Sequence, residues 1–187
     1  MAANINADTS GGLKLQSDTS GVLELKSAGT TIATVSSTGL AMASGKLLAS
    51  TGPAFIAYQG AGQTLSSATW TTMAFNTEVY DTNSNYDTST HAFTPTVAGY
   101  YNFNATVRSN AATTRFFTKF VKNGSTSFWG NDFNFAANGL ISNFGVLLYM
   151  NGSTDSVVVQ AFMQGGGGLT IDYGTQIQYS AFLARAA

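Results

Sequence analysis

From Ala54 onward, the chain alternates between short runs of apolar and aromatic residues and short polar stretches rich in Gly, Asn, Ser and Thr. Runs of this length, bounded by turn residues, predict β-strands, and no stretch has the spacing of an amphipathic helix. The sequence therefore predicts an all-β sandwich or barrel. We expect strands at Ala54–Tyr58, at Thr69–Phe75 with Trp70 and Phe75 as anchors, around Phe93, at Tyr100–Val107 and at Thr175–Ala184.

Two Asn-Gly pairs stand between apolar-rich runs of this pattern, one at Asn123-Gly124 and one at Asn151-Gly152. A type I′ turn needs a positive φ at both central residues, and Asn and Gly adopt that conformation at little cost. Each pair therefore predicts a β-hairpin between its flanking strands. The glycine run at Gly165–Gly168 predicts a flexible loop.

Residues 1–50 follow a different pattern, because they contain no Phe, Tyr or Trp and carry a tandem repeat instead. Asp8–Ser17 and Asp18–Ser27 match at seven of ten positions, and Thr38–Ser44 is a weaker third copy. In each copy, a Ser-Gly or Thr-Gly turn precedes an apolar-polar-apolar strand, which predicts one half-buried face. The apolar positions are Leu13, Leu15, Leu23, Leu25, Leu40 and Met42.

Strands with so little apolar surface are marginally stable alone, and their unpaired edges favour pairing with another chain. We therefore interpret residues 1–50 as an extended β-repeat arm for attachment or trimerisation, wound with sister chains or laid on a larger particle. The alternative is a flexible tail whose pattern is accidental. A boundary is expected near Ala49–Pro53, with a second domain at residues 51–187.

Two runs in the second domain are apolar on both faces of the predicted strand. In Phe144–Met150 one face carries Phe144, Val146, Leu148 and Met150, while the other carries Leu147 and Tyr149. Val157–Met163 shows the same property. A sandwich strand normally has one wet face, so these strands are either central ones under a loop or, as we favour, part of a subunit interface. The interface candidates are Phe144, Leu147, Leu148, Tyr149, Val158, Val159 and Phe162, and the pattern leaves open which face lies inward.

Composition narrows the function classes. Only 9% of the 187 residues are charged and the net charge is −1, so the surface is built mainly from neutral polar groups. The eight basic residues are scattered, which excludes nucleic acid as a partner because many phosphates would have to be neutralised. The chain has no cysteine, and its longest apolar run is too short to cross a membrane, so no thiolate metal site and no membrane partner are expected.

Catalytic and metal-binding chemistry finds little support. Asp81–Asp87 alternates oxygen-bearing side chains, but an EF-hand loop needs Gly and Glu where this chain has Tyr86 and Ala92. Asn/Asp turns that bond their own backbone explain the segment better. His91 is the one histidine and is expected in a surface loop, since no nucleophile motif accompanies it. Glu78 and Asp81 are close in the sequence, as the two carboxylates of a glycosidase must be close in space, but nothing else supports that role.

We therefore predict no catalytic residue, no cofactor, no metal site and no enzymatic activity. Trp129 and Phe133 offer aromatic surface that can stack on a sugar, but packing in the core or at a trimer interface is the favoured interpretation.

A resemblance to a known family emerges from the spacing of seven residues. They are Phe75, Asp81, Tyr86, Phe93, Gly99, Tyr101 and Phe103. This spacing resembles the signature of the C1q-type globular domain, the jelly roll related to tumour-necrosis-factor trimers. The departure is Ala105, where the family has an aromatic residue, which implies local repacking of the core. Pro53–Ala57 and Ser180–Leu183 resemble the opening and closing strands of the family.

The resemblance implies a ten-stranded C1q/TNF-like jelly-roll sandwich that assembles as a homotrimer. Animal members carry a signal peptide and often a collagen stalk, whereas the segment MAANINADTSGG has no features of a secretory signal. The N-terminal repeats instead resemble the Ser/Thr/Gly-rich β-repeat arms of bacteriophage virion proteins. A secreted animal-type ligand is therefore disfavoured.

The expected function is that of a structural phage protein, a homotrimeric capsid decoration protein of the cement or head-fibre kind. Its expected partners are the major capsid protein or other virion proteins, and its expected location is the virion after assembly in the host cytoplasm. The alternative is a tail-fibre knob that recognises a host surface glycan or protein receptor. The sequence leaves open whether the protein sits at the head or the tail.

Overall fold

The computed structural model describes residues 21–37, 39–44, 52–166 and 168–187. The chain divides into two compact units, Met1–Ser50 and Thr51–Ala187, which we call the arm and the head. Leu13 and Leu15, two of the residues expected to assemble the arm, lie outside the described residues. Each unit is described by itself.

The described part of the arm is a three-stranded antiparallel sheet in the order β1-β2-β3. Its strands are β1 (Leu23–Ser27), β2 (Thr30–Ser36) and β3 (Gly39–Met42). The repeat pattern predicted β1 and β3 but missed β2. Ala28 and Gly29 join β1 to β2 with φ values of 48° and 78°, which are the two positive values that a type I′ hairpin turn requires.

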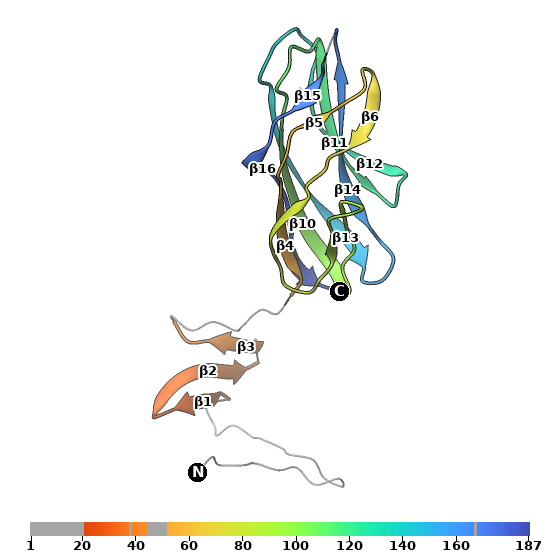
Figure 1. Ribbon diagram of the computed structural model, residues 1–187. Coiled ribbons are helices and arrows are strands. Elements are labelled where there is room, and N and C mark those ends of the chain that lie inside the picture. The colour runs from red at the N-terminus through yellow and green to blue at the C-terminus, as the bar shows by residue number, and fades with distance from the viewer. Residues whose placement is uncertain (1–20, 38, 45–51, 167) are drawn as a thin grey trace. The chain divides into compact units, whose positions relative to one another are not determined.

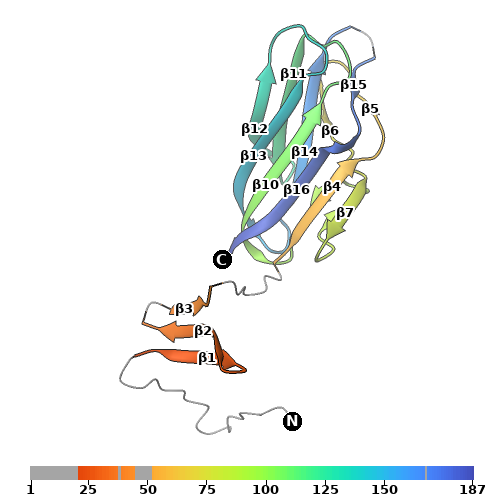
Figure 2. The same cartoon turned by 90° about the vertical axis from the view of Figure 1, so that its left-hand side faces the viewer.

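The head consists of two antiparallel sheets that face each other, and its described residues contain no helix (Figure 1). One sheet has the order β13-β10-β16-β4-β7, and Figure 2 shows these strands side by side. The other has the order β12-β11-β14-β9-β8, with β6 paired to β14, while β15 and β5 form a small separate sheet. The bounds are β4 (Ala54–Gln59), β5 (Gln63–Thr64), β6 (Thr69–Thr72), β7 (Thr77–Asp81), β8 (Tyr86–Asp87), β9 (Ala92–Phe93), β10 (Ala98–Arg108), β11 (Arg115–Lys122), β12 (Thr126–Phe133), β13 (Ile141–Asn151), β14 (Val157–Gln164), β15 (Thr170–Ile171) and β16 (Gly174–Ala186).

This architecture confirms the all-β, C1q/TNF-like jelly-roll prediction. Five strands in each principal order make up the ten strands that the resemblance implied, and β5, β6 and β15 are additional short strands. No helix among the described residues is long and apolar enough to cross a membrane.

The core lies between the two sheets and is filled mainly by rings. Strand β10 shows why, because its buried residues alternate with accessible ones and point Tyr101 and Phe103 inward. Tyr179 of β16 is fully buried, and its hydroxyl donates a hydrogen bond of 3.0 Å to the carbonyl oxygen of Val157 in the opposite sheet. The apolar members of the family-like spacing are all in this core: Phe75, Tyr86, Phe93, Tyr101 and Phe103.

Ala105 confirms the expected exception in the core. It is buried between Phe144 and Tyr179, its partners on the two neighbouring strands. The ring of Phe144 packs against that of Phe120 with 4.6 Å between centroids. Large rings on the adjacent strands therefore surround the small side chain of Ala105.

One hairpin prediction is confirmed and the other is wrong. Asn123 and Gly124 have φ values of 53° and 68° and join β11 to β12. Asn151-Gly152 instead connects strands in different sheets, because β13 pairs with β10 while β14 pairs with β11. The Asn151 side-chain oxygen accepts hydrogen bonds from the backbone N–H groups of Ser153, Thr154 and Asp155, which stabilises a turn across the edge of the sandwich.

The oxygen-rich segment at Asp81–Asp87 forms turns, as expected. The Asp81 carboxylate accepts hydrogen bonds from the backbone N–H of Asn83 at 3.3 Å and of Tyr86 at 2.6 Å. Asp87 accepts from the hydroxyl and N–H of Ser89, which lowers the pKa of its carboxyl to about 2. These acceptors are therefore engaged by their own backbone.

His91 occupies a tight turn in this same region, with a φ of 59°. Its side chain is half-buried, and burial lowers the pKa of the imidazole. It is therefore less open to solvent than the surface histidine that we expected.

Candidate functional site

The outward face of the β13-β10-β16-β4-β7 sheet carries a continuous group of accessible side chains. Inward residues alternate with outward ones along β10, so Tyr100, Asn102, Asn104 and Thr106 point away from the core. Their partners on β13 and β16 share this face, because directly opposed residues of antiparallel strands point to the same side.

The end of this face near the C-terminus is apolar. Tyr100 and Tyr149 are opposed across β10 and β13, and their rings meet edge to face with 5.6 Å between centroids. Two residues further along β10, Asn102 is flanked by Leu147 on one side and Phe182 on the other. The four apolar side chains are between 45% and 56% exposed, which is unusual for residues gathered on one face.

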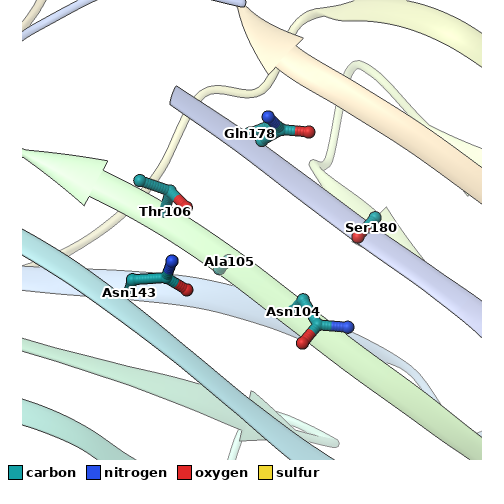
Figure 3. Close-up of a pocket in the computed structure, with 6 residues that line it drawn as sticks. All are labelled: Asn104, Ala105, Thr106, Asn143, Gln178 and Ser180. Carbon is teal, nitrogen blue, oxygen red and sulfur yellow. The ribbon is translucent and has the colours of Figure 1, made fainter. Parts of the chain in front are cut away.

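A polar groove of about 280 Å³ adjoins the apolar end (Figure 3). Asn104, Asn143 and Gln178 come from three neighbouring strands and project from the same side of the sheet. Asn104 donates a hydrogen bond of 2.7 Å to the side-chain oxygen of Asn102. The groove is lined by Asn104, Ala105, Thr106, Asn143, Gln178 and Ser180, none of which is charged.

Gly145 makes room for this groove. It lies opposite Asn104, and a Cβ atom at this position would stand 2.7 Å from the Asn104 side-chain oxygen. The missing side chain therefore lets the amide of Asn104 lie across β13. We call the apolar end and the polar groove together the assembly face. It comprises Tyr100, Asn102, Asn104, Thr106, Asn143, Gly145, Leu147, Tyr149, Gln178, Ser180 and Phe182.

The chemistry of the assembly face is suited to contact rather than to a reaction. Amides and hydroxyls both donate and accept hydrogen bonds, so each can pair with a copy of itself. Near a threefold axis a residue meets its own copies, and a charged residue there would meet like charges. The groove is neutral and fits a symmetric contact of this kind, while Arg185, a cation opposed to Tyr100 at the end of β16, lies at the apolar end.

The structure decides which face of the doubly apolar strands lies inward. Phe144, Leu148 and Val159 belong to the core of the head and are at most 9% exposed. Their burial needs no second chain, so we correct their assignment and place them in the core rather than at an interface. The strand alternation that makes β13 apolar on both sides puts Leu148 inward and Leu147 outward.

The four remaining candidates fall into two separate groups. Leu147 and Tyr149 lie on the assembly face, where Tyr100 and Phe182 join them. Val158 and Phe162 are half-buried on the outward side of β14, in the other sheet. Sequence reasoning missed Tyr100 and Phe182, although the signal was present: in Tyr100–Phe103, alternation turns the first tyrosine outward when the second is buried.

The four described arm candidates share one face of the arm sheet. Leu23 is opposed to Val35, which is opposed to Leu40, so these three form one row across the strands. Leu25, Ala33 and Met42 form the next row in the same way. Leu25, Val35 and Leu40 remain exposed. The structure therefore gathers the predicted positions into a single apolar face and adds Val35 from the strand that was missed.

Comparisons with known proteins agree with this architecture. The C1q domain family model matches residues 54–184. No curated protein matches the chain.

Three solved structures with a similar fold are the globular domain of zebrafish complement 1qA protein, murine APRIL and PRD1 vertex protein P5. The zebrafish domain has 21% identity and a TM-score of 0.56, covering 73% of this chain and 99% of its own. Murine APRIL has 8% identity and a TM-score of 0.55, covering 70% and 97%. The vertex protein has 15% identity and a TM-score of 0.52, covering 71% and 97%. At these identities, the likeness concerns the fold.

Proposed function

The chain belongs to the C1q domain family, and on that basis we propose that it is a homotrimeric structural protein of a bacteriophage particle. In this proposal it decorates the capsid as a cement or head-fibre protein, binds the major capsid protein or other virion proteins, and is assembled in the host cytoplasm. C1q/TNF-like domains typically form trimers, which supports the homotrimer.

The assembly face is the observation that carries this proposal. Tyr100, Leu147, Tyr149 and Phe182 are about half covered in a single chain. Complete burial of a large apolar side chain contributes roughly 1.5–3 kcal/mol, so covering the exposed half of each would contribute about 1 kcal/mol. Three copies of the face gain this energy together, and the side chains of the neutral groove can pair with their own copies.

The arm supports attachment as its role. Its three-stranded sheet keeps Leu25, Val35 and Leu40 exposed on one face, and a sheet of that size is marginal without a cover. Sister arms or a particle surface would supply the cover. The likeness of the head to a phage vertex protein supports a place on a virion.

Sedimentation velocity of the full chain tests the homotrimer. We expect a single species with the mass of three 19.5 kDa chains. The double variant Tyr100→Asp with Leu147→Asp should sediment as a folded monomer, because both residues lie outward and the core is untouched. Phe135→Asp, an equally exposed aromatic outside the assembly face, is the matched control and should remain a trimer. A wild-type chain that stays monomeric at all concentrations would contradict the proposal.

A second candidate function, a tail-fibre knob that recognises a host surface receptor, is favoured by one observation. The outward side of the other sheet exposes a cluster of aromatic rings centred on Trp129, which is 60% exposed. Cryo-electron microscopy of the intact particle separates the two functions. Decoration predicts many symmetric copies on the capsid, whereas a knob predicts a few copies at the tail.

A further inference from the structure

Strands β12, β11, β14 and β6 belong to one sheet of the head (Figure 1). Four aromatic side chains form a platform on the outward face of these strands. The rings come from different strands but lie close, because Trp70 is opposed to Phe162 and Phe162 to Phe117. The ring of Trp129 stacks on Phe117 at 4.9 Å, and Trp70 lies 5.3 to 5.8 Å from the other three rings. We call these four residues the aromatic platform: Trp70, Phe117, Trp129 and Phe162.

Two cations lie over this platform. The Lys119 ammonium is 4.1 Å from the Trp70 ring centroid and 5.2 Å from that of Trp129. The Arg115 guanidinium carbon is 5.2 Å from the Phe117 centroid and 5.8 Å from that of Phe162. Cation–π contacts of this kind hold both side chains close to the rings.

The charges of the platform are not balanced. Arg115 makes a two-pronged ion pair with Asp132, at 2.9 Å from Nε to Oδ1 and 2.7 Å from Nη2 to Oδ2. Lys119 has no carboxylate within ion-pair distance among the described residues. One positive charge is therefore left over, in a chain in which only 9% of residues are charged.

A depression of about 180 Å³ is lined by Arg115 and the four rings. This is a small volume, suited to one ring of a ligand rather than to a helix or a folded domain. Its walls offer flat aromatic faces, while Arg115 and Asp132 present a fixed pair of donors and acceptors at its rim. The few cations make it unsuited to a nucleic acid, which needs a longer track of positive charge.

We propose that the aromatic platform binds a saccharide that carries an acidic group. The apolar face of a sugar ring stacks on Trp129 and Phe117, and its carboxylate or phosphate pairs with the Lys119 ammonium in a charge-assisted hydrogen bond. The excess positive charge selects an acidic sugar over a neutral one. Because the platform and the assembly face lie on opposite sides of the sandwich, this site needs only a folded head and does not depend on the trimer.

The test uses the tryptophans as reporters. Trp70 and Trp129 are the only tryptophans in the chain and both belong to the platform, so intrinsic fluorescence reports on this site directly. The full-length protein is titrated with trigalacturonic acid as the carboxylated probe, glucose 1-phosphate as the phosphorylated probe and maltotriose as the neutral probe. We expect saturable binding of at least one acidic probe, weakened by salt and stronger than that of maltotriose by about tenfold or more.

Three variants, each checked for folding by circular dichroism and measured by calorimetry, sharpen the result. Lys119→Gln should reduce the affinity for the acidic probe to the level of the affinity for maltotriose. The affinity for maltotriose itself should not change. Trp129→Ala should lower the affinity for every probe by about tenfold or more, because the stacking surface is removed. Tyr149→Ala, an exposed aromatic on the assembly face, is the matched control and should bind as the wild type does.

Several outcomes would overturn the inference. These are the absence of saturable binding by any probe, an equal affinity for acidic and neutral probes, and an acidic-probe affinity that survives Lys119→Gln. Self-association that Trp129→Ala abolishes would show instead that a second copy covers the platform. The binding results do not depend on whether the wild type sediments as a trimer, so the inference and the proposed function can fail separately.

Discussion

The two outward faces of the head both expose aromatic side chains but surround them with different chemistry. On the assembly face, Tyr100 and Tyr149 adjoin a neutral groove of amides and hydroxyls, although Arg185 is opposed to Tyr100 and the Lys122 ammonium lies 5.9 Å from the Tyr149 ring centroid. On the aromatic platform, the rings stand beside Arg115 and Lys119. A groove of neutral groups that pair with their own copies suits a symmetric contact between identical chains, whereas a depression lined by rings, with the Lys119 ammonium held over two of them, suits an anionic ligand. Exposed rings alone therefore do not tell a subunit interface from a ligand site.

The largest effect is expected from two neighbouring residues of β13 that point in opposite directions. Leu148→Asp should unfold the head, because an uncompensated carboxylate in the core adds to the loss of packing, together about 4 kcal/mol or more. Leu147→Asp should leave the free energy of unfolding nearly unchanged but dissociate the trimer. Denaturant unfolding and sedimentation, measured on both variants, check this. If the Leu148→Asp variant formed a folded trimer, the Leu148 side chain would have to point out of the core rather than into it.

A charge introduced on each face is expected to have the next largest effect. Asn104→Asp should weaken the trimer by about 2 kcal/mol, since three carboxylates would approach one another near the axis. Gln160→Asp is the matched change on the platform side, next to Lys119 across the strand pair, and should leave the trimer intact. Dissociation constants from sedimentation equilibrium measure both. Equal effects of the two substitutions would remove the distinction between the faces.

Truncating one ring on each face should have a smaller effect on assembly. Tyr149→Ala should weaken the trimer by about 1 kcal/mol, because it removes one partly exposed ring from the proposed contact. Trp129→Ala should leave trimer stability as it is. Thermal dissociation followed by light scattering compares the two. The comparison fails if Trp129→Ala weakens the trimer more than Tyr149→Ala does.

The smallest expected effect concerns pH at the platform. The Arg115 guanidinium hydrogen-bonds to Asp132 and lowers the pKa of that carboxyl below its ordinary value of 3.8. Because the pKa is lower in the folded state, the pair stabilises the head fully above the ordinary pKa. This contribution is lost as the pH falls through the lowered pKa. The contribution is small, because solvent screens an exposed ion pair.

Melting temperatures measured from about pH 5 to pH 2 check this contribution. Asp132→Asn should flatten the acid side of the stability curve slightly. An unchanged curve would show that the ion pair does not stabilise the head.

Local patterns predicted most of the strands of the head, because strand formation depends largely on residues that are close in the sequence. Alternation around Tyr101 and Phe103 placed both rings in the core, and Asn123-Gly124 identified its hairpin through the φ values that these residues tolerate. The same reasoning failed at Asn151-Gly152, because a turn sequence specifies a local backbone path and not the sheet that the next strand joins. It also missed β2, whose turn at Ala28-Gly29 lacks the usual asparagine.

The candidate sites could be predicted only in part. Leu147, Tyr149 and the arm leucines were identified as apolar residues in need of a cover, whereas Phe182 and the polar groove were not. Of the aromatic platform, Trp129 and Phe162 were named separately, but their grouping with Trp70 and Phe117 was missed. The platform joins Trp70 to Trp129 from strands that are far apart in the sequence, with β11 and β14 between them. No spacing along the chain encodes such a neighbourhood.

Composition and short-range periodicity by themselves determined an all-β fold with a ring-filled core, a neutral surface and a repeat-bearing N-terminal segment, and the resemblance of the Phe75–Phe103 spacing to the C1q-type signature implied the jelly roll. The tertiary structure alone decided which side of each doubly apolar strand faces the core. Alternation divides the side chains of a strand into two sides but does not show which side faces the core. That depends on which strands pack opposite. Once Leu148 is packed inward, Leu147 must point outward, and the assembly face follows from that choice.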